Sequence, residues 1–409
     1  MAVIRISGPS AGLALERLTG RLPDARRAIL ARLQASAGDL LDEAMVLWLP
    51  GPATATGDDI AELHCHGGRA VVAAVLAALG KIPGLRAATA GEFTRRAFAN
   101  GRIDLAEAEG LADLLTAETE LQRRAAIAMA GGGFSEVVTG WRARVLGASA
   151  QIEALLDFAD EDDLSVLPEE FGGELGKLRS ELTDWLGRPR AETLRDGYRV
   201  VIAGPPNAGK STLFNALIED EAAITAPVAG TTRDVLTRPV ALAGVPFVFV
   251  DTAGLRNESG DAIEAIGMAR ARGAVSDADL VLWLGPEGAG PTGSWEIDAQ
   301  ADRVDFPRKS HPRHRLSAVS GFGMQGLRED LVATARAGLP KPGMAALNAR
   351  QHGLLTGARN ALAQAEHLSD PLLAAEELRR ARLSFDTLLG HTTTEDMLDT
   401  LFGRFCIGK

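Results

Sequence analysis

The stretch GPPNAGKST, residues 204–212, decides how this chain is organised. It matches the pattern G-x-x-x-x-G-K-[ST], follows the apolar run YRVVIA at 198–203 and leads into the helix-like run TLFNALI at 212–218. The motif requires this strand–loop–helix context, because the glycines let backbone N–H groups surround phosphates at a helix N-terminus. Lys210 can neutralise the β and γ oxygens, and Ser211 can ligate Mg²⁺. We therefore predict a phosphate-binding loop.

Two later segments stand in the order expected of a GTPase rather than a general ATPase. GTTRD, residues 230–234, offers hydroxyls that can complete a Mg²⁺ shell and sense the γ-phosphate. DTAGL, residues 251–255, follows an apolar strand; Asp251 can act through a Mg²⁺-bound water, and Gly254 can donate its backbone N–H.

The residue that orients the attacking water is missing from its usual place. A Ras-like enzyme needs a glutamine after Asp-x-x-Gly, and here Leu255 occupies that position. Another group must do this work. Asn207, inside the loop, can help to ligate a monovalent cation; its alternative interpretation is a turn-former.

The segment that would read the nucleobase is degenerate. An Asn-Lys-x-Asp pattern is expected after the strand ADLVLWL at 278–284, and the nearest match is Asp-Arg-Val-Asp at 302–305. Asp305 is then the candidate carboxylate for guanine N1–H and N2–H. The loop LSAVSGFG at 316–323 fits the segment that backs the base. The order of the motifs therefore supports guanine more than the base-reading residues do.

Changes of pattern along the chain predict a multidomain protein of α/β and all-α parts. Residues 1–100 read as mixed α/β, 101–194 as amphipathic helices, 195–338 as a parallel α/β domain, and 339–409 as helices again. We infer that the two helical sets pack together, with the P-loop domain inserted between them. Thr392 and Glu395 have capping-box spacing and predict the start of the last helix.

Composition excludes several classes of protein. A hydrophobic content of 46%, a charged content of 24% and a net charge of −11 describe a globular chain without a generally nucleic-acid-binding surface. Two cysteines, Cys65 and Cys406, cannot form a disulfide framework. We find neither a secretory signal nor a membrane-spanning run, and expect a cytoplasmic protein. The basic run at 306–315 is interpreted as a solvated loop, and the final Lys409 argues against prenylation of Cys406.

Seven segments carry a family resemblance across nearly the whole chain. They are TGDDIAELHCHGG (56–68), AGEFTRRAFANGRIDLAEAEGLADLL (90–115), GPPNAGKS (204–211), AGTTRDV (229–235), DTAGLR (251–256), EAIGMARA (264–271) and FCIGK (405–409). Together they resemble the MnmE (TrmE) family of tRNA modification GTPases. The first two and the last are far more specific than a P-loop.

The resemblance implies an N-terminal folate-binding and dimerisation domain, a discontinuous helical bundle and an inserted Ras-like G domain. It also implies a homodimer whose GTPase is activated by K⁺ and which forms a heterotetramer with the flavoprotein MnmG. This family installs an aminomethyl or carboxymethylaminomethyl group on the wobble uridine (U34) of certain tRNAs. The one-carbon unit comes from a 5-formyl or 5,10-methylene tetrahydrofolate derivative.

The resemblance also implies roles for individual residues. Glu264 is similar to the family's water-orienting glutamate; a solvated glutamate at a helix start is the alternative. Ser211 and Thr232 correspond to Mg²⁺ ligands. The implied K⁺ ligands are Asn207, Ala226, Val228 and Thr231. The implied GTP-binding residues are Asn207, Ala208, Gly209, Lys210, Ser211, Thr212, Ala226, Pro227, Val228, Ala229, Gly230, Thr231, Thr232, Asp251, Thr252, Ala253, Gly254, Asp305, Ser317 and Ala318.

For the folate site the matching positions are Arg5, Glu62, Arg102 and Lys409. Their charges suit a pterin edge and a glutamate tail. Family members commonly have lysine where Arg102 stands, and their first strand is longer than the one that begins at Met1. Cys406 is a candidate reactive thiol, although nothing in the sequence indicates a lowered pKa.

Two other functions stay open at this point. A regulatory switch, such as a ribosome-assembly GTPase, would need neither the HCHGG segment nor the FCIGK terminus. A folate-dependent one-carbon carrier without GTPase activity is disfavoured by the P-loop, Asp251 and Glu264.

Overall fold

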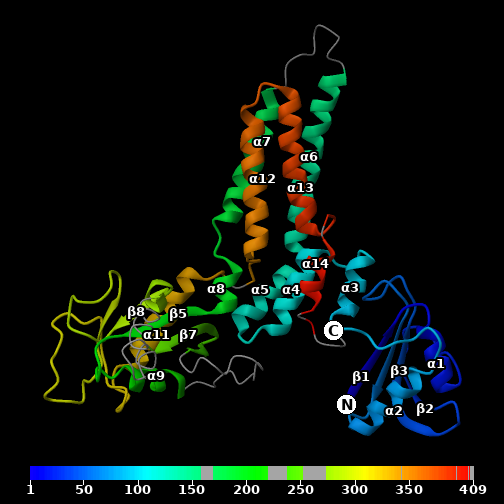
Figure 1. Ribbon diagram of the computed structural model, residues 1–409, viewed down its shortest axis with the longest axis horizontal. Coiled ribbons are helices and arrows are strands. Elements are labelled where there is room, and N and C mark those ends of the chain that lie inside the picture. The colour runs from blue at the N-terminus through cyan, green and yellow to red at the C-terminus, as the bar shows by residue number, and fades with distance from the viewer. Residues whose placement is uncertain are drawn as a thin grey trace, which may run out of the picture. The chain divides into compact units, whose positions relative to one another are not determined.

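The computed structural model describes residues 1–157, 169–219, 237–251, 273–341, 343–392, 394–403 and 405 (Figure 1). The chain divides into two compact units. Unit 1 comprises Met1–Leu115, Ala130–Gly147 and Arg382–Lys409, and unit 2 comprises Thr116–Met129 and Ala148–Ala381. These units are coarser than the four parts expected from the sequence, and that finer division stays a prediction.

Unit 1 contains a four-stranded antiparallel sheet with the strand order β1-β4-β3-β2. The elements of this part are β1 (Ala2–Ser7), α1 (Ala11–Thr19), β2 (Ile29–Gln34), β3 (Leu40–Leu49), β4 (Ile60–Cys65) and α2 (Arg69–Leu79). Side chains alternate between the two faces of a strand, so Ile6 and Leu63 point into the core that α1 and α2 cover. The opposite face carries Arg5 and Glu62, which are direct partners in the β1–β4 register.

The helices of unit 1 include segments from both ends of the sequence. They are α3 (Glu92–Ala99), α4 (Leu105–Thr116), the first part of α6 (Gly133–Asp157), the last part of α13 (Pro371–Leu389) and α14 (Glu395–Phe402). Leu105 of α4 shares an apolar core with Phe402 of α14. The rings of Trp141 and Phe385 pack 6.0 Å apart and join α6 to α13.

The start of α14 differs from its prediction. Thr394 is the N-cap, whereas Thr392 was expected there. The hydroxyl of Thr392 lies 2.9 Å from the hydroxyl of Thr387 on α13, so it is engaged in the preceding turn and the helix begins later.

Unit 2 contains a six-stranded sheet with the order β10-β9-β8-β5-β7-β6. All neighbours are parallel except β6 and β7. The elements are β5 (Tyr198–Ala203), α9 (Lys210–Glu219), β6 (Thr237–Leu242), β7 (Val245–Asp251), β8 (Leu280–Trp283), β9 (Trp295–Asp298), β10 (His314–Arg315) and α11 (Met324–Gly338). The central strands are almost wholly apolar, as is typical of parallel strands covered on both faces. The predicted α/β region therefore forms the expected kind of sheet.

Further helices that the structure describes in unit 2 come from both sides of this sheet in the sequence. They are α5 (Glu120–Ala130), α7 (Glu169–Leu186), α8 (Ala191–Asp196) and α12 (Ala349–His367), with the adjoining parts of α6 and α13. Helices α7 and α12 run side by side (Figure 1), and Arg179 and Glu366 form an ion pair of 3.4 Å between them. The predicted packing of the earlier helices against the later ones is confirmed for this pair.

The chain enters and leaves the α/β part at neighbouring points. The backbone N–H of Ala191 donates to the carbonyl of Leu347 over 2.9 Å. One residue further, the carboxylate of Glu192 accepts a hydrogen bond from the N–H of Ala349, the first residue of α12. Leu194 of the same short helix α8 belongs to the core of the sheet. Helix α8 is thus bonded to α12 and packed on the sheet at once.

Candidate functional site

The phosphate-binding loop occupies the turn between β5 and α9. Its path needs unusual backbone angles: φ is 152° at Gly204, 61° at Asn207 and 91° at Gly209. A side chain at residue 204 would crowd the backbone of Leu284 and Gly285, so glycine is required both for conformation and for space. Helix α9 begins at Lys210, which places its free N–H groups at the loop.

Lys210, Ser211 and Asp251 come together at this turn as the sequence predicts. Lys210 is 6% exposed, and its Nζ donates to the carbonyl of Pro205 over 2.7 Å. The hydroxyl of Ser211 donates to Oδ2 of Asp251, at the end of β7, over 2.6 Å. A hydroxyl and a carboxylate side by side are the oxygen donors that Mg²⁺ prefers, so these residues fit that ion.

A cavity of about 760 Å³ opens beside the loop. This volume is in the range of pockets that hold small ligands and cofactors. The residues that line it are Pro206, Asn207, Gly209, Lys210, Ser211, Thr212, Ala299, Gln300, Asp302, Arg303, Ala318 and Val319. The cavity therefore joins the phosphate loop to the segments that follow β9 and β10, where the sequence places the base-reading residues. Ala208, within the loop, is buried, and Ser317 is fully buried.

The carboxylate that reaches this cavity is Asp302, whereas Asp305 was predicted. Asp302 lies four residues beyond the end of β9 and lines the cavity; Asp305 is exposed and is not among the lining residues. A hydrogen bond from the Ser317 side chain holds the pKa of Asp302 below its usual range, so this carboxylate is ionised near neutral pH. The match to Asp-Arg-Val-Asp did not use the point at which the strand ends, and the base-reading role of Asp305 stays a prediction beside that of Asp302.

Gln300 is a residue that the sequence interpretation missed. Its Nε2 donates to the carbonyl of Asn207 over 2.9 Å, and its Oε1 accepts from Arg303 over 3.1 Å. An isolated β-bridge between Gln300 and Ser317 fixes the segment after β9 against the loop after β10. The segment after β9 therefore supports the phosphate loop directly. Its available signal was the position of Gln300 two residues after the strand WEID at 295–298.

The basic run at 306–315 is largely exposed, as expected, but Lys309 is buried and several of its charges are paired. Lys309 is 8% exposed, and its Nζ bonds Glu296 over 2.5 Å and the carbonyl of Trp283 over 2.7 Å. Arg308 and Arg315 both pair with the buried carboxylate of Asp298, at 3.4 and 3.0 Å. Two of the acids that pair with this run lie in β9, and Arg313 pairs with Asp330 of α11 at 3.5 Å, so much of its charge is neutralised within the domain.

On the outer face of the sheet in unit 1, Arg5 and Glu62 are brought together. Nε of Arg5 lies 3.1 Å from Oε1 of Glu62, and the other carboxylate oxygen lies 3.0 Å from Nε2 of His64. The guanidinium of Arg5 also stands over the ring of Phe93 on α3, at 5.4 Å from its centroid. A cation, a carboxylate, an imidazole and an aromatic ring meet here, a set that suits a flat, polar-edged ligand. His64 was not predicted for this site.

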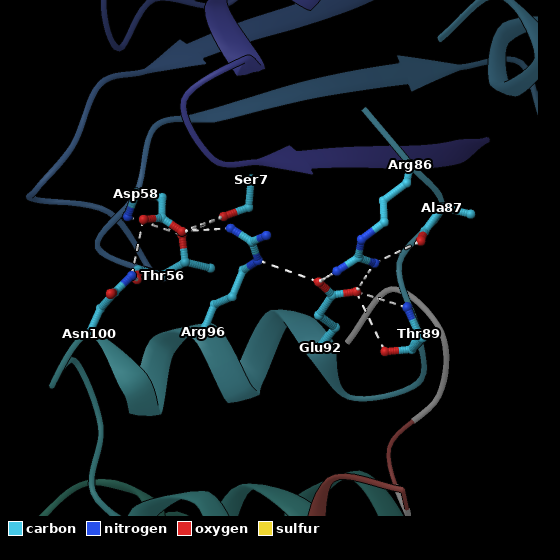
Figure 2. Close-up of polar contacts among 9 residues, drawn as sticks. All are labelled: Ser7, Thr56, Asp58, Arg86, Ala87, Thr89, Glu92, Arg96 and Asn100. Carbon is cyan, nitrogen blue, oxygen red and sulfur yellow. Dashed lines mark hydrogen bonds and ion pairs between the residues drawn. The ribbon is translucent and has the colours of Figure 1, made fainter. Parts of the chain in front are cut away.

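Arg102 belongs to a neighbouring part of unit 1. Its Nε donates to the carbonyl of Thr54 over 3.1 Å. Figure 2 shows the polar contacts that hold the same loop to α3 and its C-cap: Asp58 lies 3.1 Å from Arg96, and Asn100 donates to the carbonyl of Thr56 over 2.7 Å. Glu92 pairs in turn with Arg86.

Some predicted residues lie outside the part of the chain that the structure describes. They are Ala226, Pro227, Val228, Ala229, Gly230, Thr231, Thr232, Thr252, Ala253, Gly254, Glu264, Cys406 and Lys409. Their roles stay predictions. Among the helices with described coordinates, none combines the length and apolar character that crossing a membrane requires.

Two family models match the chain. The model described as the MnmE helical domain covers residues 105–406, and the model described as the GTP-binding protein TrmE N-terminus covers residues 1–102. Similar curated proteins include a tRNA modification GTPase MnmE of Erythrobacter litoralis, 62% identical, and one of Novosphingobium aromaticivorans, 63% identical. Each alignment covers 100% of this chain and 96% of the relative. A relative with the same description from Zymomonas mobilis is 48% identical with the same two coverages.

Proposed function

The chain belongs to the MnmE (TrmE) family of tRNA modification GTPases, and we propose that its GTP hydrolysis serves the modification of wobble uridine in tRNA. The observation that carries the GTPase half is the hydrogen bond between Ser211 and Asp251 at the phosphate loop, where Ser211 lines a cavity that extends to Asp302. The cavity thus has the ammonium group of Lys210 and the hydroxyl of Ser211, which is bonded to Asp251, at one end and the carboxylate of Asp302 at the other.

The residues around the cavity have different roles in binding GTP. Lys210 and the N–H groups at the start of α9 neutralise phosphate oxygens. Asp302, held ionised by Ser317, accepts hydrogen bonds from the N1–H and N2–H of guanine. Adenine presents no such pair of donors on that edge, so Asp302 favours GTP over ATP. We assign this role to Asp302 in place of Asp305.

Two cations complete the proposed site. Ser211 and Thr232 would hold Mg²⁺, and Asn207, with Ala226, Val228 and Thr231, would hold K⁺. Bound there, the ions would stabilise the charge that develops on the transferred phosphoryl group. Glu264 would orient the water that Leu255 cannot orient. This set of roles is a proposal that rests on motif position.

The tetrahydrofolate site is proposed on the outer sheet face of unit 1. Arg5 and Glu62 support it by forming a charged pair beside Phe93, and Arg102 and Lys409 are proposed as further contacts. A tetrahydrofolate derivative, as 5-formyl or 5,10-methylene, would supply the one-carbon unit. The terminal Cys406 is kept as a candidate thiol for that step.

The assembly is proposed on the same family grounds. We propose a cytoplasmic homodimer that joins the flavoprotein MnmG in a heterotetramer and forms 5-aminomethyl or 5-carboxymethylaminomethyl uridine at U34.

The test is mass spectrometry of tRNA nucleosides from a strain that lacks the gene. The strain should lose the modified wobble uridine, regain it with the wild-type chain and fail to regain it with Glu264→Ala. Glu264→Ala should bind GTP with nearly unchanged affinity, which separates catalysis from folding. Full modification in the deletion strain would refute the proposed function and leave a regulatory GTPase as the alternative.

A further inference from the structure

Helix α3 (Glu92–Ala99) presents two faces with different partners. Residues spaced four apart along a helix share a face, so Glu92, Arg96 and the following Asn100 form one row. Arg95 and Phe98 lie on another side. The neighbouring arginines Arg95 and Arg96 therefore point to different parts of unit 1.

The first face contacts the loop that joins β3 to β4. Arg96 reaches Asp58 at 3.1 Å and Glu92 at 3.6 Å, and Asn100 donates to Asp58 over 3.1 Å (Figure 2). Phe93, one residue after Glu92, contacts Arg5 of β1. Through this face α3 touches one proposed tetrahydrofolate contact, and Arg102 follows the helix by three residues.

The second face holds α14. Arg95 forms ion pairs with two carboxylates one helical turn apart, with Asp399 at 2.6 Å and with Glu395. The ring of Phe98 packs 6.1 Å from that of Phe402, which in turn packs 6.1 Å from Phe405. One arginine thus neutralises a pair of like charges that would otherwise repel each other.

Gly91, immediately before α3, brings the two helices into close contact. Its φ is 69°, and a Cβ built at this position would overlap the carbonyl of Phe402. Gly101, just after α3, has a similar φ of 63° but nothing within 4 Å of its built Cβ. The two glycines share a left-handed backbone conformation, but only at Gly91 would a side chain collide with α14.

We propose that α3 fixes α14 relative to the proposed tetrahydrofolate site. Arg95 is the positioning residue, and its ion pairs with Glu395 and Asp399 are called the clasp below. The inference rests on the proposed function, because it gives α14 a part in the modification step and none in GTP hydrolysis. The substrate class it serves is the folate-bound one-carbon unit. The proposal concerns the anchoring of α14 and not the residues after Phe405.

The exposure of the charges explains why the clasp can be opened without unfolding the protein. The side chains of Arg95, Glu395 and Asp399 are 40%, 76% and 63% exposed. Ion pairs at such sites contribute little to global stability and are screened by salt. A reversal of charge at residue 95 should therefore loosen α14 locally, by repulsion between three acidic side chains, and leave the sheet and its core in place.

The test compares full-length variants that open the clasp in two different ways. Arg95→Glu places three acidic side chains together, and Gly91→Ala introduces the clash with Phe402. Gly101→Ala is the matched control for backbone strain, and Arg17→Glu, at an exposed position of α1, is the control for net charge. A triple change, Arg95→Glu with Glu395→Arg and Asp399→Arg, restores opposite charges.

Three measurements are made on each variant: amide exchange of residues 395–403, GTP hydrolysis, and wobble-uridine modification in the deletion strain. In Arg95→Glu and Gly91→Ala we expect about tenfold faster exchange, loss of modification and GTP hydrolysis at the wild-type rate. The controls should keep all three properties, and the triple change should recover modification.

The proposal is overturned if exchange accelerates while modification persists, or if neither variant accelerates exchange. Failure of the wild-type chain to restore modification would refute the proposed function instead. The exchange measurement needs no tRNA, so the two failures are distinguishable.

Discussion

Gln300 donates a hydrogen bond to the backbone carbonyl of Asn207, and this contact of 2.9 Å ties the segment after β9 to the phosphate loop. Asn207 has a left-handed backbone, with φ at 61°, which is uncommon for a residue other than glycine. Gln300 therefore stabilises the conformation that the loop needs before nucleotide binds.

Loss of this contact should weaken nucleotide binding. Gln300→Ala should raise the Kd for GTP by about three- to tenfold, the effect of one neutral hydrogen bond that preorganises a loop. Titration with a fluorescent GTP analogue measures it. Gln325→Ala, which removes a contact with Glu329 within α11, is the control and should leave the Kd unchanged. Equal affinities for Gln300→Ala and wild type would show that the loop holds its shape unaided.

Replacement of Asp302 by alanine should reduce the affinity for GTP far more than replacement of Asp305. Asp302→Ala should weaken GTP binding by about a hundredfold, because two hydrogen bonds to an ionised carboxylate are lost. Asp305→Ala should have no effect, since this residue does not line the cavity. Competition between GTP and ATP measures the accompanying loss of base preference. A larger effect at Asp305 would return the base-reading role to that residue.

Hydrolysis should depend on the monovalent cation. K⁺ should accelerate GTP turnover well above the rate in Na⁺ at the same ionic strength. Asn207→Gly should bring the two rates together, because glycine keeps the left-handed backbone and removes only the side-chain ligand. Initial rates of phosphate release in the two salts provide the measurement. Equal rates for the wild-type chain would exclude the proposed role of Asn207.

Glu92 should make the stability of unit 1 dependent on pH. The hydrogen bonds from Arg86 lower the pKa of Glu92 from 4.5 to about 2. A carboxyl whose pKa is lower in the folded state adds stability above its unfolded pKa and loses it as the pH falls toward the folded pKa. Glu92→Gln should therefore cost about 1–2 kcal/mol at pH 7, after allowance for the exposed Arg86 partner.

The difference between Glu92→Gln and wild type should shrink between about pH 4.5 and pH 2. Amide exchange of α3 in increasing urea follows it. Glu120→Gln is the control: the pKa of Glu120 is also lowered to about 2, by Arg123 and Arg124, but these side chains are about half-exposed on α5, so solvent screens the pairs and the replacement should change little. A pH-independent effect at Glu92 would mean that shape, rather than charge, holds the contact.

The phosphate loop could be predicted because its signal is local: a strand, a glycine-rich turn and a helix start within 21 residues, at 198–218. Which of Asp302 and Asp305 lines the cavity could not be predicted from the sequence. It depends on where β9 ends and on the β-bridge between Gln300 and Ser317. The ion pairs of the basic run could not be predicted for the same reason. Glu296 and Asp298 become neighbours of its charges only when β9 and β10 pair.

The clasp on α14 shows the same limit over a longer distance. The spacing of Glu395 and Asp399 is visible in the sequence, but Arg95 lies about 300 positions earlier. Gly91 likewise reads as an ordinary turn residue until Phe402 packs against it. Patterns of period 3.6 predict that a helix has a face, and only the fold tells which face meets which partner.

The backbone hydrogen bond between Ala191 and Leu347 brings the two ends of the α/β part of unit 2 together, so that this part is an exchangeable module. A segment whose two ends meet can be removed or exchanged without pulling its host apart, because a short linker is enough to close the gap. Helix α7 and helix α12 would then remain a continuous hairpin. The same junction offers a place to insert a reporter or to swap in the corresponding segment of a relative, so that the two halves of the protein can be altered one at a time.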